Sequence, residues 1–418
     1  MPKLSLHRLP RVATLSFAMM FTGITHAQTL ARPGWAGSGM NAAPWWKHAV
    51  VYQADPRGFG GLHGLATHLD YVHSIGVDAL LLTSLGGDAK QPIDPTLGTL
   101  EDLDEIVRRS SEYNIRVLVD LDAHAADVMA MTRLWLTHGV AGFHVAGATA
   151  AQIADIKRSL GGFAGQRVII GDFSGSEDST TRGADSPQLI ADGRAGTQEK
   201  FTAATVRPAL EAAQQIVDQG SAIPLLFSDG PALKRSIDRY DDGTHSVEIA
   251  RALATMLLTT RAATMLYYGQ ELGFTGAASS AISFDQPKKD EQPAAMSVAA
   301  EETTPTSLLN WYRQLSALTH SNRTISTGAM ITLNHDEQNI LAWVRKPQAA
   351  SLATPAVVVV ENLSAQPVTV SLKADMQKLH LKGSFLRTVM RSDNAMGGMH
   401  LDSLTLPPFG VFIGELRY

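Results

Sequence analysis

Short apolar runs and amphipathic helical stretches alternate along residues 45–274, and this alternation constrains the fold more than any other feature. Each β-type run is followed by a stretch whose apolar residues are three and four positions apart, as in a helix. Repetition on this scale predicts a parallel sheet, and the number of repeats suits a closed (β/α)8 TIM barrel, which is an α/β fold. The expected strands are 48–53, 78–83, 116–120, 142–146, 168–172, 224–228 and 264–268.

The predicted helices lie between these strands, and one of them carries clear end signals. The helix at 99–113 begins on Thr99, has acids in its first turn, and ends with Arg108 and Arg109. The remaining helices are expected at 65–75, 127–137, 205–218, 246–260 and 307–318. Residues 174–204 are polar and read mainly as loop, so the sixth strand has no assigned place. Residues 275–305 predict a mobile loop by composition.

The periodicity changes to two beyond about residue 325, which predicts strands rather than further helices. The expected strands are 340–344, 356–360, 368–372 and 410–413, separated by turn residues. They predict a small antiparallel β-sandwich. The chain is thereby divided into a barrel at 45–324 and a C-terminal domain at 325–418, preceded by a linker at 28–44.

The first 27 residues have the pattern of a secretory signal peptide. Basic residues at the start are followed by the apolar run Val12–Ile24 and by the small-residue site Thr25–Ala27. A membrane anchor is the alternative, but a spanning helix needs about 20 apolar residues and this run is shorter. The chain has no cysteine, so an exported protein of this kind needs no disulfides. A periplasmic or secreted bacterial location is expected.

Composition restricts the class of partner. A length of 418 residues, 44% hydrophobic, gives ample material for a core, and the formal net charge is −5. Nucleic acid is therefore not an expected partner, because there is no basic footprint. No later segment is apolar enough to predict a membrane span. This composition and net charge are compatible with a neutral ligand such as a sugar.

Four separated motifs resemble those of the α-amylase superfamily, glycoside hydrolase family 13. Trp45–Gln53 resembles the family's opening strand, Ile93–Pro95 the loop before its second helix, Tyr267–Glu271 its eighth strand, and Leu406–Gly410 its closing sandwich strand. The matches occur in the right order. The resemblance implies retaining glycoside hydrolysis or transfer, which uses a nucleophilic carboxylate, a carboxylic acid that protonates the leaving oxygen, and a second Asp.

The fourth predicted strand departs from the family pattern at its most important position. Where the family reads Gly-Phe-Arg-x-Asp, residues 142–146 read Gly-Phe-His-Val-Ala. His144 takes the place of the Arg, and Ala146 takes the place of the nucleophilic Asp. No Asp or Glu occurs between residues 142 and 154. A methyl group cannot attack an anomeric carbon, so the resemblance implies that the nucleophile is missing.

The two remaining catalytic positions are also altered. Asp172 stands at the acid position, where the family has Glu; its carboxyl would be withdrawn by roughly 1 Å, which can cost about 100-fold. Asp172 is thus either a weakened acid or a polar group at the pocket rim. Asp229 is the candidate for the third carboxylate, with a solvated loop acid in an Asp-Gly turn as the alternative.

Three further residues are candidates for contact with a sugar. His144 and His124 are predicted to lie at the pocket. Tyr52, at the end of the first strand, could stack on a sugar through its ring, or could pack in the core. Asp120, Asp122 and His124 together could suggest metal ligands, but Ala123 replaces the family's calcium-associated Asn, so no metal or other cofactor is predicted. The domain that the family usually inserts after strand three is missing here.

The resemblance therefore supports two hypotheses. The first is a catalytically impaired pseudo-glycosidase of α-glucan or maltodextrin metabolism that binds an α-linked glucose oligosaccharide or polysaccharide, or a protein partner. Loss of one member of a cooperating catalytic set can cost about 10⁴ to 10⁶ in turnover. The alternative is an active α-amylase or α-glucosidase that uses Asp172 and Asp229, with inversion if the two carboxyls lie about 6.5–9.5 Å apart.

Overall fold

The computed structural model describes residues 44–173, 186–220, 222–276, 281–285, 297–349, 351, 354–393 and 395–417. The predicted signal peptide at 1–27 and all of the predicted linker at 28–44 except Pro44 lie outside these residues. The described residues form one compact unit.

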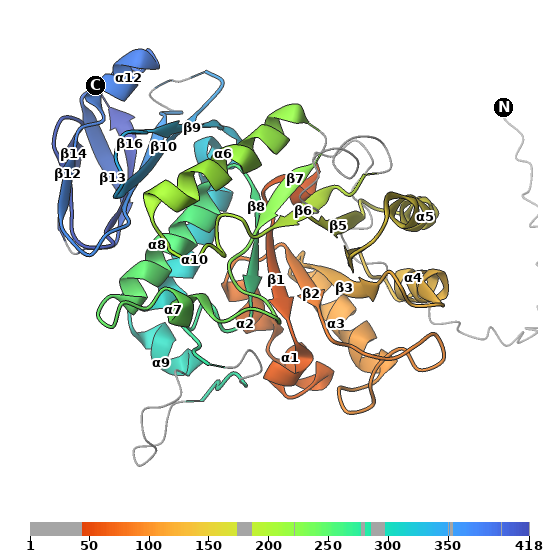
Figure 1. Ribbon diagram of the computed structural model, residues 1–418. Helices are drawn as coiled ribbons and strands as arrows, with labels where there is room; N and C mark the ends of the chain where they lie inside the picture. The colour runs from red at the N-terminus through yellow and green to blue at the C-terminus, as the bar shows by residue number, and fades with distance from the viewer. Residues whose placement is uncertain are drawn as a thin grey trace, which may run out of the picture. The chain divides into compact units, whose positions relative to one another are not determined.

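Eight parallel strands close into a barrel (Figure 1), which confirms the predicted fold class. Closure follows from β1, which hydrogen-bonds to β2 on one side and to β8 on the other. The barrel strands are β1 (Val50–Ala54), β2 (Ala79–Leu82), β3 (Arg116–Asp122), β4 (Gly142–Ala146), β5 (Val168–Asp172), β6 (Leu189–Asp192), β7 (Ile223–Leu226) and β8 (Ala263–Tyr267).

Helices follow the strands around the outside of the barrel. The predicted capping of α3 is present: the Thr99 hydroxyl accepts from the Asp102 backbone N–H, and the Asp102 carboxylate accepts from the Thr99 N–H. The helical elements of this part are η2 (Trp45–His48), η3 (Pro56–Phe59), α1 (Leu62–Thr67), α2 (Leu69–Ser74), α3 (Leu100–Glu112), α4 (Val128–Thr137), α5 (Ala150–Leu160), α6 (Ala203–Gln219), α7 (Ser236–Arg239), α8 (Ser246–Thr259), α9 (Val298–Thr303), α10 (Leu308–Ser321) and α11 (Arg323–Thr327).

Three sequence predictions are corrected by the structure. The helix expected at 65–75 is divided into α1 and α2 at His68, whose ring stacks on Phe284 at 3.5 Å between centroids. The sixth strand lies within the stretch 174–204 that was read mainly as loop; β6 has only four residues and is bounded by polar and Gly residues. Part of the expected loop at 275–305 is the helix α9, which begins on Ser297.

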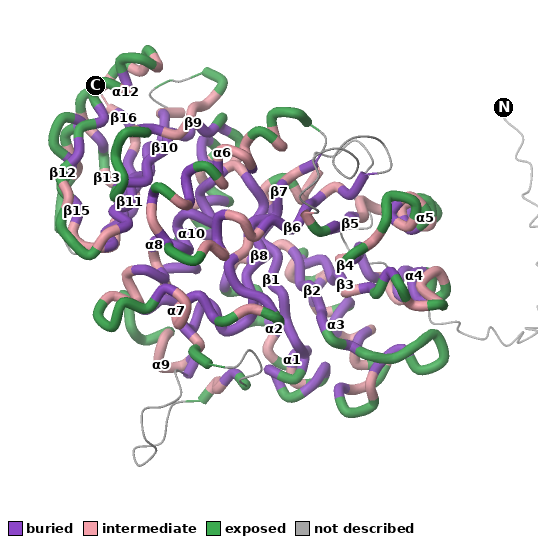
Figure 2. Tube along the Cα trace, viewed as in Figure 1, coloured by how far each residue is buried: buried purple, intermediate pink, exposed green. Residues whose placement is uncertain are grey.

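The barrel strands are buried on both faces (Figure 2), but the two faces pack against different layers. Residues of one parity fill the barrel interior, including Val51, Leu118 and Ile170. Residues of the other parity, such as Tyr52 and Val119, pack against the surrounding helices. This alternation decides which polar side chains near the strand ends face the barrel mouth.

The C-terminal domain is antiparallel, as predicted, and is built from two sheets. Six strands pair in the order β14-β13-β16-β11-β10-β9, and β12 pairs with β15. The larger sheet packs one face on the two-stranded sheet and the helix α12. The elements are β9 (Ala329–Leu333), β10 (Ile340–Lys346), β11 (Val357–Asn362), β12 (Val368–Val370), α12 (Lys373–Lys378), β13 (Phe385–Arg391), β14 (Met399–His400), β15 (Leu404–Leu406) and β16 (Val411–Arg417).

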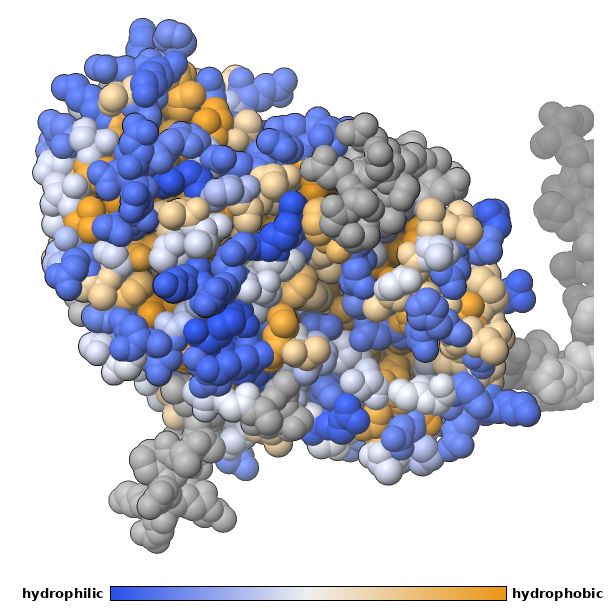
Figure 3. Space-filling model, viewed as in Figure 1, coloured by the Kyte–Doolittle hydropathy of each residue, from blue (hydrophilic) through white to orange (hydrophobic). Residues whose placement is uncertain are grey.

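The other face of the six-stranded sheet shares a hydrophobic core with the barrel helices. Trp343 of β10 and Val359 of β11 belong to the same buried cluster as Leu253 of α8. Hydrophilic residues cover much of the surface drawn in Figure 3, with hydrophobic residues in small separate patches. The barrel and the C-terminal sheet therefore contact each other through apolar surface that is removed from water.

A single arginine supplies much of the polar bonding between the barrel and the C-terminal domain. Arg207 of α6 is buried and donates to the backbone carbonyls of Asn334, His335, Glu337 and Ile340, at 2.7–3.2 Å. These carbonyls belong to β10 and to the turn before it, so the guanidinium satisfies acceptors that the sheet does not use.

We expect Arg207→Met to destabilise the protein by about 2–3 kcal/mol, because it leaves several carbonyl acceptors without a donor. The measurement is the urea concentration at the unfolding midpoint, by far-UV circular dichroism. Arg133→Met, at an exposed position of α4, is the control and should change stability by less than about 0.5 kcal/mol. Equal midpoints for the two variants would contradict the assigned role of Arg207.

Candidate active site at the barrel mouth

The carboxyl ends of β3, β4 and β5 bring three titratable side chains together. Asp120 lies directly opposite His144 in the β3–β4 register. Asp172 is the last residue of β5, the strand on the other side of β4. Asp120 and Asp172 follow two residues after Leu118 and Ile170, which point into the barrel interior. Because side chains alternate along a strand, both acids face the mouth of the barrel.

His144 bridges the two acids. Its Nδ1 lies 2.6 Å from Asp120 Oδ1, and its Nε2 lies 3.1 Å from Asp172 Oδ1. The second oxygen of Asp172 accepts from the Gly147 N–H at 3.1 Å. Gly147 has a φ of +64°, which a glycine adopts without strain, so the turn after β4 can direct its N–H at this carboxylate.

The charges of these three groups depend on one another. Burial lowers the pKa of His144, but the hydrogen bonds and charges of Asp120 and Asp172 outweigh it and raise the pKa to about 9. The hydrogen bond from His144 in turn lowers the pKa of Asp172, against the opposing effect of burial. At neutral pH His144 is therefore an imidazolium, held between Asp120 and Asp172.

Ala146 ends β4 at the same mouth, where its methyl group is exposed. It lies opposite Asp122 of β3, whose Oδ1 accepts from the His124 backbone N–H at 2.8 Å. His124 is also exposed, and its Nε2 lies 3.5 Å from the position that a Cβ on Gly147 would occupy. The structure therefore brings His124, His144 and Asp172 to one side of the mouth. Ala146, which stands among them, carries no carboxylate.

The α-amylase catalytic-domain model matches residues 50–133. Trehalose-6-phosphate hydrolase of Escherichia coli (strain K12) is 39% identical over 95 residues, which cover 18% of this chain and 17% of the relative. Oligo-1,6-glucosidase of Bacillus cereus is 34% identical over 95 residues, with the same coverage. These matches show a similarity to the α-amylase superfamily, which the family model places in the first part of the barrel.

Two comparisons extend over most of the chain. The amino acid transporter heavy chain SLC3A2 of Oryctolagus cuniculus is 24% identical over 363 residues, covering 72% of this chain and 64% of that relative. The solved structure of trehalose-6-phosphate hydrolase from Bacillus licheniformis matches 90% of this chain and 100% of its own, with a TM-score of 0.76 and 15% identity. The latter comparison shows the fold alone.

The predicted mouth position of Asp229 needs correction. Its side chain is buried after β7, where Oδ1 accepts from the Ser236 N–H and Oδ2 from the Ser228 hydroxyl, each at 2.7 Å. Gln270 bonds Ser228 Oγ and extends this network to Tyr312 of α10. Asp229 is therefore neither a solvated loop acid nor an acid open to a ligand in this structure; it holds the β7–α7 connection.

The predicted sugar-stacking role of Tyr52 is likewise contradicted, and the core-packing alternative is confirmed. Tyr52 is 0% exposed and faces the helices, since its neighbour Val51 points into the barrel. Its hydroxyl donates to Glu271 Oε1 at 2.7 Å, and Tyr71 donates to the same oxygen at 2.5 Å. This ring belongs to the layer between strands and helices, where no ligand can reach it.

Sequence reasoning missed Asp120 as the partner of His144. The available signal was that both residues lie near the ends of neighbouring parallel strands, but their pairing depends on the register. Among the described residues there is no group of three or more His, Cys, Asp or Glu side chains that could hold a metal ion. No helix in the described part of the chain is long and apolar enough to cross a membrane.

Proposed function

We propose that this protein binds an α-linked glucose oligosaccharide at the barrel mouth without hydrolysing it, as a pseudo-glycosidase. Two features together carry the proposal: Ala146 stands at the end of β4, and Asp172 is ion-paired with His144. Ala146 offers no nucleophilic oxygen at the end of β4. His144 keeps Asp172 ionised, whereas an acid catalyst must be protonated near neutral pH.

The same groups are suited to binding. Asp120, Asp122 and Asp172 offer carboxylate oxygens to sugar hydroxyls, and the exposed ring of His124 offers a further polar contact. Hydrogen bonds to charged groups are stronger than those between neutral groups, so a few of them suffice to orient a neutral ligand. The glucosidase relatives support an α-glucoside as the ligand.

We expect purified protein to bind maltotriose in calorimetric titration and to release no glucose from it, nor nitrophenol from p-nitrophenyl α-glucoside. Absence of the nucleophile alone should lower turnover by about 10⁴ to 10⁶ relative to an intact active site. Asp172→Asn is the test variant, and Asp402→Asn, at an exposed position of the C-terminal domain, is its control. Turnover that disappears in Asp172→Asn but not in Asp402→Asn would establish the active-glycosidase alternative.

A protein partner is the second candidate. It is favoured by the long alignment to the amino acid transporter heavy chain SLC3A2, which is named as the heavy chain of a transporter. Absence of heat with maltotriose, together with capture of a specific partner, would favour this candidate.

We also propose an exported location, on the basis of the leader-like residues 1–27. Detection of the mature protein in a periplasmic or culture-medium fraction tests this proposal.

A further inference from the structure

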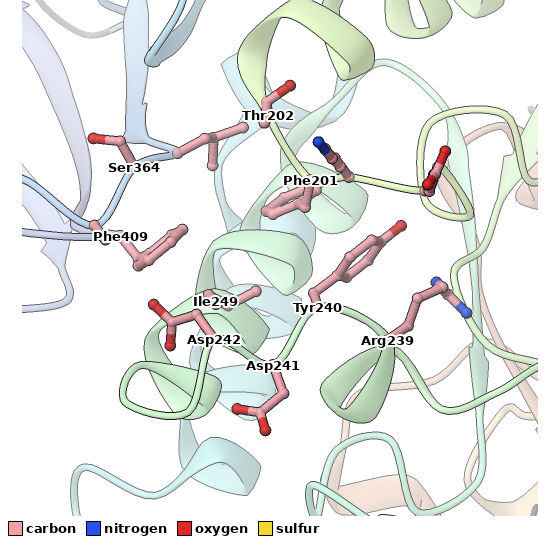
Figure 4. Close-up of a pocket in the computed structure, with 13 residues that line it drawn as sticks. Phe201, Thr202, Arg239, Tyr240, Asp241, Asp242, Ile249, Ser364 and Phe409 are labelled. Atoms are coloured by element: carbon pink, nitrogen blue, oxygen red, sulfur yellow. The ribbon is translucent and has the colours of Figure 1, made fainter.

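A cavity of about 330 Å³ lies between the barrel and the C-terminal domain (Figure 4). It shares no lining residue with the barrel mouth. Five buried apolar side chains form its floor: Phe201, Tyr240, Ile249, Leu363 and Phe409. Ligand pockets of this size occur preferentially at such domain junctions. We call it the junction pocket.

The aromatic floor of the junction pocket is held in place before any ligand arrives. The rings of Phe201 and Tyr240 lie 5.4 Å apart between centroids with an angle of 31° between planes. The Tyr240 hydroxyl donates to the Gly196 carbonyl at 2.8 Å. Phe409 has a φ of +48°, which a bulky residue rarely adopts, and its N–H donates to the Ser364 carbonyl at 3.1 Å. Because the rings are already fixed, the protein loses less conformational entropy when a ligand binds.

The rim of the junction pocket is polar and carries more acids than bases. Glu199, Asp241 and Asp242 lie there together with Lys200 and Arg239. The Arg239 guanidinium already donates to the carbonyls of Gly196, Ser228 and Lys234. An anionic ligand would therefore meet three carboxylates and the ammonium of Lys200, which has no hydrogen-bond partner among the described residues.

The two aspartates of the rim differ in how many of their carboxylate oxygens are already hydrogen-bonded. Asp242 bonds the His245 ring and two backbone N–H groups, which lower its pKa to about 2. The Asp241 bonds from Ser246 and Gly243 both go to Oδ1, so its Oδ2 has no hydrogen-bond partner among the described residues. Ionised acceptors beside a flat aromatic floor suit a ligand with one apolar face and several hydroxyl groups.

The geometry points to the junction pocket as a second carbohydrate site, which takes a pyranose unit of a neutral α-linked gluco-oligosaccharide. The C–H face of the sugar would pack on Phe201 and Phe409, and its hydroxyls would donate to Asp241 Oδ2. Phosphorylated sugars are disfavoured by the acidic rim. The inference does not require binding at the barrel mouth, since the two sites share no residue.

Hydrogen–deuterium exchange of the full chain with maltotriose tests the inference. At about 10 mM maltotriose, which reveals sites with a Kd up to the millimolar range, we expect slower exchange in segments 199–202, 239–249 and 363–365. Ala365→Arg places a long side chain at the exposed rim and should weaken this protection about tenfold. Ala374→Arg, on the exposed face of α12, adds the same charge away from the pocket and should leave it unchanged.

Each outcome decides between the two sites. Protection confined to residues 120–147 and 172 would overturn the junction pocket and leave the proposed function standing. Protection of the junction segments that survives Ala365→Arg would overturn the assigned pocket. Equal protection by glucose 6-phosphate would overturn the assignment to a neutral ligand. Phe201→Leu, which keeps an apolar floor but removes one ring, gives a second variant if Ala365→Arg folds poorly.

Discussion

His144→Gln should lower the free energy of unfolding by about 2 kcal/mol at pH 6. The glutamine keeps hydrogen-bonding capacity but removes the charge that lies between Asp120 and Asp172. A pKa rise from 6.5 to about 9 corresponds to roughly 3 kcal/mol. The expected loss is smaller because about a third of the Asp120 side chain and nearly half of the Asp172 side chain remain in water.

The effect should depend on pH with a defined sign. The pKa of His144 is raised on folding, so its contribution is fully present below pH 6.5 and is lost as the pH rises through about 9. The pKa of Asp172 is lowered on folding, so its contribution is present above its unfolded value of 3.8 and is lost as the pH falls below it. The stability difference between wild type and His144→Gln should therefore be largest between about pH 4 and 6.5.

Urea unfolding at pH 5.5, 7 and 9 measures this difference. The matched control is His138→Gln, because His138 lies 2.7 Å from a single carboxylate, that of Asp104, and is similarly buried. Its substitution should cost less than about 1 kcal/mol. If His144→Gln and His138→Gln behave alike at every pH, the bridging histidine does not hold the two acids as described.

Glu361→Leu should stabilise the protein by about 2 kcal/mol at pH 7.5. Glu361 lies on β11 with 0% of its surface exposed, and neither carboxylate oxygen has a hydrogen-bond partner among the described residues. Its side chain points to the same face of β11 as those of Val357 and Val359, which pack in the core that includes the barrel helices. An unpartnered polar group in such a place costs about 1–3 kcal/mol, which an apolar side chain of similar size avoids.

The pH dependence of Glu361 runs opposite to that of an ion-paired acid. Burial raises its pKa well above 4.5, so above pH 4.5 the folded protein binds more protons at this carboxyl than the unfolded chain does. Wild-type stability should therefore fall as the pH rises above 4.5. Glu361→Gln has nearly the same shape and cannot ionise, so it should gain stability at pH 7.5 but not at pH 4.5. A loss of stability in Glu361→Leu at both pH values would show that the carboxyl makes a stabilising interaction.

Local patterns predicted the elements whose boundaries are marked by chemistry. The bounds of β4 and β5 agree with the predicted 142–146 and 168–172, because buried parallel strands appear as short apolar runs between turn residues. The helix at 99–113 was marked by Thr99, which caps it. The strand β6 escaped prediction because it lies in a stretch rich in polar and Gly residues, which reads mainly as loop.

The candidate site was predicted less completely than the fold, for a specific reason. Both faces of a barrel strand are buried, so period-two alternation does not tell which parity faces the interior. Tyr52 was assigned to the mouth for this reason, although it faces the helices. Asp229 was assigned from its place after β7, but the N–H of Ser236, seven residues later, holds its carboxylate inside the loop.

The sequence by itself determined the superfamily resemblance, the (β/α)8 order and the presence of Ala146 where that resemblance implies a nucleophile, because these depend on residue identity and short-range spacing. Only the tertiary structure decided that His144 is an imidazolium shared by Asp120 and Asp172. That charge state depends on the register of three strands and on burial, since hydrogen bonds of 2.6 and 3.1 Å arise only when the barrel closes.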